Sequence, residues 1–180
     1  MIPANVESDI FLSLPKTFKF NNISRIVVVE KSAIANISDM VENNDVAVTI
    51  SFINEKEDPE LTPPNHKLAR IQNADLSISY KMGAYETCVL SMNICVSKRI
   101  RTPQVDLDGM MKAYLSALDS WYYITLRTVV EPIDRVSQDL TFLENGIYRR
   151  HLDVTVRYKV QVPNIVDTFD TVAFDTTVIQ

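Results

Sequence analysis

The feature that most limits the fold is a stretch near the C-terminal end in which apolar and polar residues alternate without a break. One set of positions holds Leu152, Val154, Val156, Tyr158, Val160 and Val162, and the other holds Asp153, Thr155, Arg157, Lys159 and Gln161. Successive side chains of a strand point to opposite faces, so this pattern predicts a strand with one buried face and one polar face. The chain must therefore build a sheet with a core on one side.

Other segments are predicted to add strands to this sheet. Period-two or β-branched runs occur at residues 26–29, 46–52, 76–82 and 88–96. Gly83-Ala84 is predicted to turn between the last two, which would make them an antiparallel hairpin. Asn145-Gly146 predicts a second hairpin turn. Residues 121–130 are β-rich, Pro132 would end or bend that strand, and residues 133–144 are ambiguous, with a short helix as one reading.

Two segments have apolar residues at helical spacing. One runs over residues 32–43 with Ser32 as a candidate N-cap. The other begins at Asp106 or Asp108, with an apolar stripe of Leu107, Met111, Tyr114, Leu115 and Leu118. The predicted fold class is α+β, a mostly antiparallel β-sheet flanked by two or three helices. We expect a single domain over residues 1–180, an N-terminal arm or short opening element at 1–20, and an exposed loop at 54–66, where three prolines stand.

Composition excludes several classes of protein. The chain has 3 glycines, and phosphate loops, dinucleotide turns and nucleophile elbows need clustered glycines. Its net charge of -5 disfavours wrapping of a nucleic-acid duplex. No signal-peptide pattern or membrane-length apolar run occurs, so we expect a soluble chain with no membrane partner. The 2 cysteines would lie on opposite faces of one strand, which argues against a disulfide and for a reducing cytosol.

No catalytic, cofactor-binding or metal site is predicted, and the chain is not expected to be an enzyme. His66 and His151 have no sequence-local partners of the kind that a metal site or general base needs. The carboxylates near residue 57 lack the alternation and the glycine turn of a calcium loop. Because catalytic triads assemble from residues far apart in sequence, a serine or cysteine nucleophile stays open.

Charged clusters are the candidate sites of contact with other subunits. The basic ones are Lys98, Arg99, Arg101, Arg149, Arg150, Arg157 and Lys159, and the acidic ones are Glu55, Glu57, Asp58, Glu60 and Asp153. Charges on exposed strands also serve solubility and keep sheet edges from aggregating. The two interpretations have equal weight, and a contact with passing DNA ranks behind both.

The C-terminal half carries a resemblance to a known family. Residues 107–162 include the segments LDGMMKAYLSALDSW, ITLRTVVEPID and ENGIYRRHLDVTVRYKVQV. The last of these resembles the closing strand of bacteriophage tail terminator and neck (head-tail completion) proteins, an arginine followed by alternation of the form R-x-L-x-V-x-V-x-Y. The matching positions are Arg150, Leu152, Val154, Val156 and Tyr158. The segment from Asp45 to Arg101, with three strands and a long loop, departs from a minimal terminator.

The resemblance implies a structural virion protein. Its subunits would form a homo-oligomeric ring, a hexamer, that ends the tail tube and joins tail to head, with the tail tube protein and head-completion proteins as partners. DNA would pass through the lumen without specific binding, and the protein would be made in the host cytoplasm. Another tail or baseplate adaptor, a tube-like protein, a non-viral peptide-binding module and an unrecognised small-molecule enzyme remain alternatives.

Overall fold

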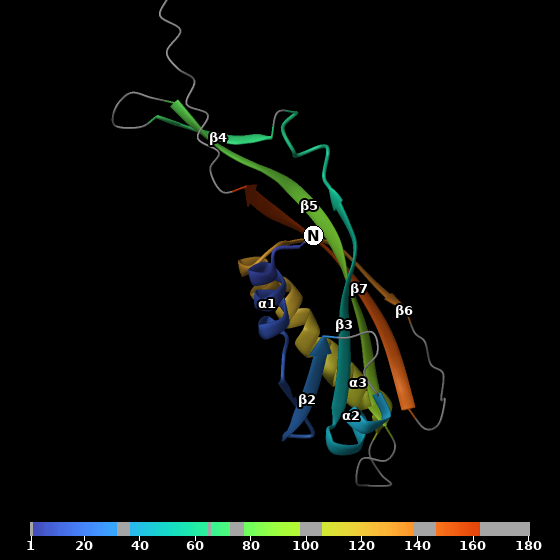
Figure 1. The fold of residues 1–180 in the computed structure, drawn as a ribbon. Helices are drawn as coiled ribbons and strands as arrows, with labels where there is room; N and C mark the ends of the chain where they lie inside the picture. The colour runs from blue at the N-terminus through green and yellow to red at the C-terminus, as the bar shows by residue number, and fades with distance from the viewer. Residues whose placement is uncertain are drawn as a thin grey trace, which may run out of the picture. The chain divides into compact units, whose positions relative to one another are not determined.

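The structure is a computed structural model that describes residues 2–31, 37–64, 66–72, 78–97, 106–138 and 147–162. In chain order (Figure 1) its elements are α1 Ala4–Ser13, β1 Thr17–Phe20, β2 Ile23–Lys31, α2 Ile37–Asn43, β3 Val46–Glu57, β4 Lys67–Gln72, β5 Ile78–Ser97, α3 Leu107–Ser120, β6 Glu131–Gln138 and β7 Ile147–Val162. A π-helical turn, Trp121–Thr125, and a 3-10 turn, Leu126–Thr128, follow α3. None of the described helices is long and apolar enough to cross a membrane.

The contacts gather in two compact units. Unit 1 comprises Met1–Glu57 and Glu86–Tyr158, and unit 2 comprises Asp58–Tyr85 and Lys159–Gln180. Strands β5 and β7 contribute residues to both units. The single domain over residues 1–180 stays a prediction.

The sheet of unit 1 has the strand order β1-β2-β3-β5-β7-β6, and β4 pairs with β5 within unit 2. The α+β class is confirmed, but the sheet is mixed, because β2 and β3 run parallel while β1–β2, β3–β5 and β6–β7 are antiparallel. A parallel neighbour needs a crossover connection. The segment that contains α2 supplies this crossover between β2 and β3.

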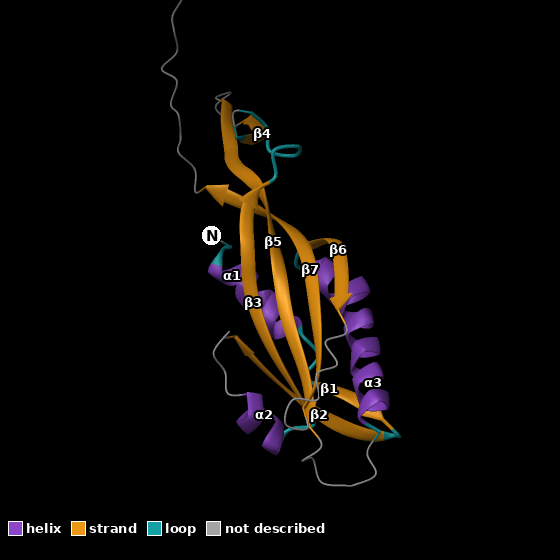
Figure 2. Ribbon diagram, turned by 90° about the vertical axis from the view of Figure 1, so that its right-hand side faces the viewer, coloured by secondary structure: helices purple, strands orange, loops and turns teal. Residues whose placement is uncertain are grey.

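One face of the sheet forms the main core of unit 1, beneath α1 and α3 (Figures 1 and 2). It holds the even-numbered apolar residues of the three central strands, all buried: Val46, Val48, Ile50, Cys88, Leu90, Met92, Ile94, Val96, Leu152, Val154, Val156 and Tyr158. From α3 come Met110, Met111, Tyr114 and Leu118. The predicted alternation of β7 is confirmed, and its apolar face is the core face.

A smaller cluster covers part of the opposite face. Met40 and Val41 of α2 pack with Ala47 and Cys95, against the half-buried Val28 and Ile147. The first five residues of β3 are therefore buried on both faces. The alternating pattern of residues 46–52 predicts a strand with one buried face, and that part of the prediction is wrong. Helix α2 lies within the predicted 32–43, and its proposed N-cap Ser32 lies outside the described residues.

The N-terminal segment, predicted as an arm or a short opening element, forms a helix and a strand with buried side chains. Helix α1 and strand β1 bury Ile10, Leu14 and Phe18. Trp121 Nε1 donates to Ser13 Oγ at 2.8 Å, and the Tyr114 hydroxyl donates to the Pro15 carbonyl at 3.4 Å. Prolines before and after the helix set its ends without preventing burial of the apolar residues between them.

Helix α3 continues where a strand was predicted. Asp106 caps it, as predicted, by accepting from Gly109 N at 2.9 Å. The β-rich residues 121–128 form the π and 3-10 turns, which bury Trp121, Tyr122 and Leu126. Aromatic and β-branched residues favour strands, but burial of side chains overrides that preference. Residues 133–144 are predicted as ambiguous, with a short helix as one reading, and residues 133–138 of them belong to β6. Residues 139–146, with the predicted turn at Asn145-Gly146, lie outside the described residues.

The predicted hairpin around Gly83 is wrong. Residues 78–97 are one strand, and Gly83 lies within it. A Cβ at this position would collide with the Val160 carbonyl oxygen and would lie 2.5 Å from Leu68 Cδ1. The glycine therefore allows a neighbouring strand to approach closely, because it has no side chain. Close approach of another backbone is, besides a turn or a bulge, a usual reason for glycine in a strand. An unrecognised turn does join β1 and β2, where Asn21 and Asn22 adopt positive φ values of 51° and 62°.

The predicted loop 54–66 begins later than expected. Strand β3 continues to Glu57 through an irregularity between Ile53 and Lys56, where Asn54 has a φ of 55°. A bulge of this kind lets pairing resume beyond an unpaired residue. The proline-containing turn starts at Asp58, and Asp58 and Thr62 are buried in it.

We expect Gly83→Ala to loosen unit 2. The added methyl group would meet a backbone oxygen, which cannot rotate away, so the cost should be about 1–3 kcal/mol. Hydrogen exchange should become faster in β4 and the adjoining part of β5, with little change in α3. Ala69→Ser, an exposed change on β4, is the matched control, and equal exchange in the two variants would contradict the assignment.

Candidate functional site

The structure separates the predicted interface residues into several environments. Arg149, Arg150, Asp153, Arg157 and Lys159 lie along β7, and Glu55 and Glu57 lie at the exposed end of β3. Asp58 and Glu60 lie in the turn that follows. Lys98, Arg99 and Arg101 lie outside the described residues.

Polar side chains gather on the face of the unit 1 sheet that is opposite α1 and α3, beyond the part that α2 covers. We call this surface the open face and define it by seven half-buried residues of β3, β5 and β7: Ser51, Ser91, Asn93, His151, Asp153, Thr155 and Arg157. The β3–β5 register pairs Ser51 with Ser91. Alternation places these residues on the polar face whose reverse is the core.

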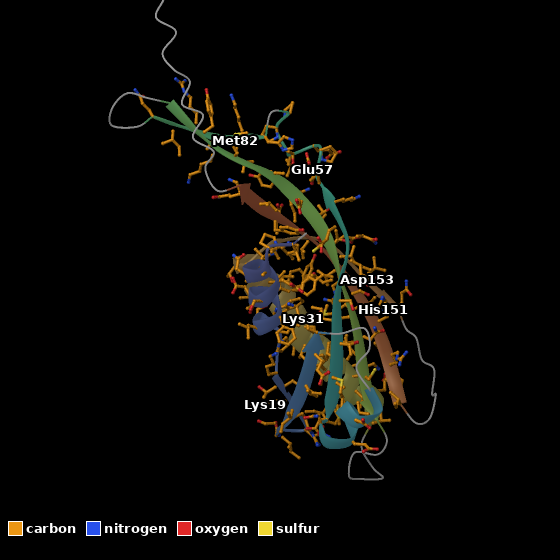
Figure 3. The ribbon with its side chains drawn as sticks, viewed as in Figure 1. Lys19, Lys31, Glu57, Met82, His151 and Asp153 are labelled. Atoms are coloured by element: carbon orange, nitrogen blue, oxygen red, sulfur yellow. The ribbon has the colours of Figure 1, made fainter. Side chains whose placement is uncertain are left out.

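His151 lies on β7 within the open face, near Asp153 (Figure 3), and its ring contacts three other residues of that face. Its Nδ1 lies 3.2 Å from Asn93 Oδ1, and its Nε2 lies 3.3 Å from Ser91 Oγ and 2.9 Å from Asp153 Oδ1. Four side chains from two strands thus form one network, and its members fix the orientation of the imidazole. Sequence reasoning treated His151 as a lone histidine; the alternation of β7 with Asp153 two residues away was the signal that could have paired them.

The order Ser91, His151, Asn93 resembles that of a nucleophile, a base and an orienting residue. Two observations disfavour catalysis by this group. The Asp153 carboxylate lies 2.9 Å from Nε2, closer than the Ser91 hydroxyl at 3.3 Å, so it competes with Ser91 for that nitrogen. Ser91 also lies mid-strand between paired neighbours, so its backbone N–H belongs to the sheet ladder rather than to an oxyanion hole.

The edge strand β6 adds to the open face through a bulge. The register shifts between Pro132 and Asp134, after which Asp134 pairs with Thr155 and Val136 with Asp153. Val136 is 48% exposed, an apolar side chain on an otherwise polar surface. Arg157 donates to Glu131 Oε2 at 3.2 Å across the two strands. The open face therefore carries both signs of charge and an apolar margin.

The arginine pair is divided between the two faces of β7. Arg149 bonds to Cys95 on the α2 side, where burial raises the pKa of the thiol and Arg149 partly opposes that rise. Arg150 lies towards the start of α3, where Lys112, then Tyr148 and Arg150, lower the pKa of Asp108. Lys112 Nζ is 2.5 Å from Asp108 Oδ2. Both arginines thus have contacts within the subunit, and the predicted role in subunit contact remains a prediction.

Carboxylates of unit 1 concentrate around Cys88 on the core face. Glu55 accepts from the Ile2 backbone N–H at 2.9 Å, and Glu86 accepts from the Tyr158 hydroxyl at 3.1 Å. Burial, with added repulsion from Glu55 and Glu86, raises the pKa of Cys88 to about 12. Burial and the bond to Glu86 likewise raise the pKa of Tyr158. The thiol is a buried apolar group here, and not a nucleophile.

Asp58 is buried and makes hydrogen bonds within the turn of unit 2. Its backbone N–H donates to the Tyr85 carbonyl at 2.7 Å, and its Oδ1 accepts from Glu60 N at 3.1 Å. Thr62 Oγ1 donates to the Tyr85 carbonyl and accepts from the Tyr85 N–H, at 3.1 and 3.0 Å. Glu60 is exposed, and Lys159 lies over the Tyr85 ring at 5.8 Å. Among the described residues, no three His, Cys, Asp or Glu side chains are grouped to hold a metal ion.

Comparison with solved structures finds proteins of similar fold. One match is the tube-terminating cap of the anti-feeding prophage, with a TM-score of 0.51 and 14% identity over 91% of this chain. Another is the sheath/tube terminator of the extracellular contractile injection system PVC in its extended state, with a TM-score of 0.55 and 15% identity over 100% of this chain. The chain shares their fold.

The similarity covers both halves of the chain, whereas the sequence resemblance was confined mainly to the C-terminal half. The chain spans 56% and 64% of the length of those two proteins. No protein-family profile matches the sequence, and no curated protein matches it.

We expect stability to fall at alkaline pH. The folded chain keeps the Cys88 and Cys95 thiols and the Tyr114 and Tyr158 hydroxyls protonated, because burial raises the pKa of each. The unfolded chain releases these protons first, so the stabilisation is complete below about pH 8.5 and is lost as pH rises, by up to ~1.4 kcal/mol per pH unit for each group.

Urea unfolding between pH 8 and pH 11 measures this slope. Cys88→Ala should make the slope shallower, because one titrating group is removed, whereas Ser116→Ala should leave it unchanged. A free energy of unfolding that is flat over this range would contradict the assignment of these groups.

Proposed function

We propose that this chain is a structural subunit that ends the tube of a tail-like particle. The observation that carries the proposal is the fold, which matches two tube-terminating proteins over almost the whole chain. The site chemistry agrees with a structural role, because the polar network of the open face lies on the surface of a sheet, and Ser91, its hydroxyl member, lies mid-strand within the sheet ladder. One of the two named proteins belongs to an extracellular contractile injection system, which favours that kind of tail.

The subunits of such a terminator would form a closed ring, a hexamer. A ring needs a head-to-tail interface between two different surfaces of the same chain. The open face is suited to be one of them, since it is broad, carries both signs of charge and is bordered by the exposed apolar residues Ile53 and Val136. Interfaces with a polar centre of this kind gain specificity from charge complementarity.

The partners that follow are a second copy of the chain and the tube protein. A phage version would also meet head-completion proteins and would let DNA pass, as the sequence resemblance implies. The two similar structures are described as a cap and a sheath/tube terminator, so they support the tube end of this proposal. The junction with a head stays a prediction.

Light scattering coupled to size exclusion, over a range of protein concentrations, tests the ring. We expect a discrete species of six times the chain mass, or a monomer that converts to it when assembled tube is added. The reason is that ring interfaces of weak individual affinity close cooperatively. A chain that stays monomeric at every concentration, with and without tube, would overturn the proposal.

A substitution in the centre of the open face tests which surface closes the ring. Thr155→Arg puts a long cation among half-buried neighbours, so we expect loss of the ring and retention of the monomer fold, read by circular dichroism and mass. Ser116→Arg, on the exposed side of α3, is the matched control and should assemble normally. A Thr155→Arg variant that assembles like the wild type would exclude the open face as an interface.

A further inference from the structure

Within unit 2, strands β4 and β5 form an antiparallel pair, which we call the hairpin. Among its described side chains no apolar one is buried, and Leu68, Ile71, Tyr80 and Met82 are only half-buried. Hydrogen bonds hold the hairpin together, from Gly83 N to His66 O at 2.9 Å and through the turn at Asp58. A small set of strands with few buried apolar side chains is marginally stable in water. Cover by a further surface would therefore stabilise the described part of the hairpin.

Cations line this hairpin. Lys67 Nζ lies 4.1 Å from the centre of the Tyr80 ring, and the register places Arg70 directly opposite Tyr80 (Met82, on the same strand, is marked in Figure 3). Arg70 and Lys81 are exposed. A cation held over an aromatic ring is partly ordered before binding, so it loses less side-chain freedom when a partner arrives.

The paired strands of the hairpin carry cations and no carboxylate. Strand β4 and residues 78–85 of β5 contain Lys67, Arg70 and Lys81 and no aspartate or glutamate. The chain as a whole carries a net charge of -5, and the described part of unit 1 has eleven basic and fifteen acidic side chains. A second copy of the chain therefore offers carboxylates, the groups that the cations of the hairpin require.

Protection of an exposed strand edge is the simpler explanation for lysine and arginine on β4. It accounts for Arg70, which is exposed on the edge strand. It does not account for the absence of a buried apolar side chain in the described hairpin, nor for Lys81 on β5, which is paired with β4. A partner surface accounts for all three.

We propose that the β4–β5 hairpin is an assembly arm that packs its cations against carboxylates of a second copy of this chain. This inference rests on the proposed ring and names one of its contacts. A head-to-tail ring needs two unlike, complementary patches, and a cationic hairpin on a chain with an excess of carboxylates can provide them. The contact should weaken as salt rises, since exposed charges are screened.

The decisive variant is Lys67→Glu/Arg70→Glu. We expect its oligomer to dissociate at least tenfold more readily than the wild type in sedimentation at low salt, with a smaller difference at high salt. The matched control is Lys19→Glu/Arg127→Glu, which reverses two exposed cations of unit 1 and should assemble normally. Lys67→Gln/Arg70→Gln removes the cations without adding acid, and should give an intermediate loss if the fold of the arm is kept.

Carbodiimide cross-linking identifies the occupant. It joins amines to carboxylates that are already in contact, so mixed isotope-labelled and unlabelled chains should yield Lys67 or Lys81 bonded to Asp or Glu of the other copy. Cross-links within one chain only, or none from the hairpin, would overturn the inference. So would a variant that loses affinity for DNA while its assembly is unchanged, because the cations would then serve phosphate.

The outcomes separate the two proposals. A wild-type ring with an unaffected Lys67→Glu/Arg70→Glu variant overturns the assembly arm and leaves the ring standing. A wild-type chain that never assembles overturns both.

Discussion

Burial of one face of β3, β5 and β7 beneath α1 and α3 is the constraint on which unit 1 depends. The even-numbered residues of these strands fill the core, and several of them have no exposed area at all. Because the side-chain period of a strand is two, a shift of one residue would move the whole set into water and bring His151, Asp153 and Arg157 into the core. The same register that makes the core thus fixes the polar network on the other face.

The parts of the fold that follow from local periodicity could be predicted, and those that follow from tertiary packing could not. Strand β7 and helix α3 can be recognised in the sequence because each buries one regular apolar face against one partner surface. Residues 121–128 look like a strand, yet burial of Trp121 against α1 keeps them helical. Gly83 looks like a turn because sequence cannot distinguish a glycine that reverses the chain from one that admits a neighbouring backbone.

The candidate site was harder to predict than the fold because its residues are recruited across strands. Charge alone selected Arg149 and Arg150, and the structure divides them between two faces, one beside Cys95 and the other near Asp108. Asp58 is a predicted acidic contact; its carboxylate accepts a hydrogen bond within a turn, and its role in subunit contact stays a prediction. The sequence alone does not single out Ser91 and Asn93, because the partner of a polar residue on a strand is known only once the neighbouring strand and its register are known.

The proposed role as a tube terminator requires contact surfaces rather than a pocket. The distribution of polar, charged and reactive side chains in this chain agrees with that requirement. Its buried thiols and hydroxyls hold their protons, so the reactive side chains of the core are inert. Its half-buried polar groups lie on a sheet face, and the cations Lys67, Arg70 and Lys81 lie on a hairpin that has no buried apolar side chain among the described residues. Surfaces of this kind gain most of their stability when another subunit covers them, because only then do the charges leave water in paired form.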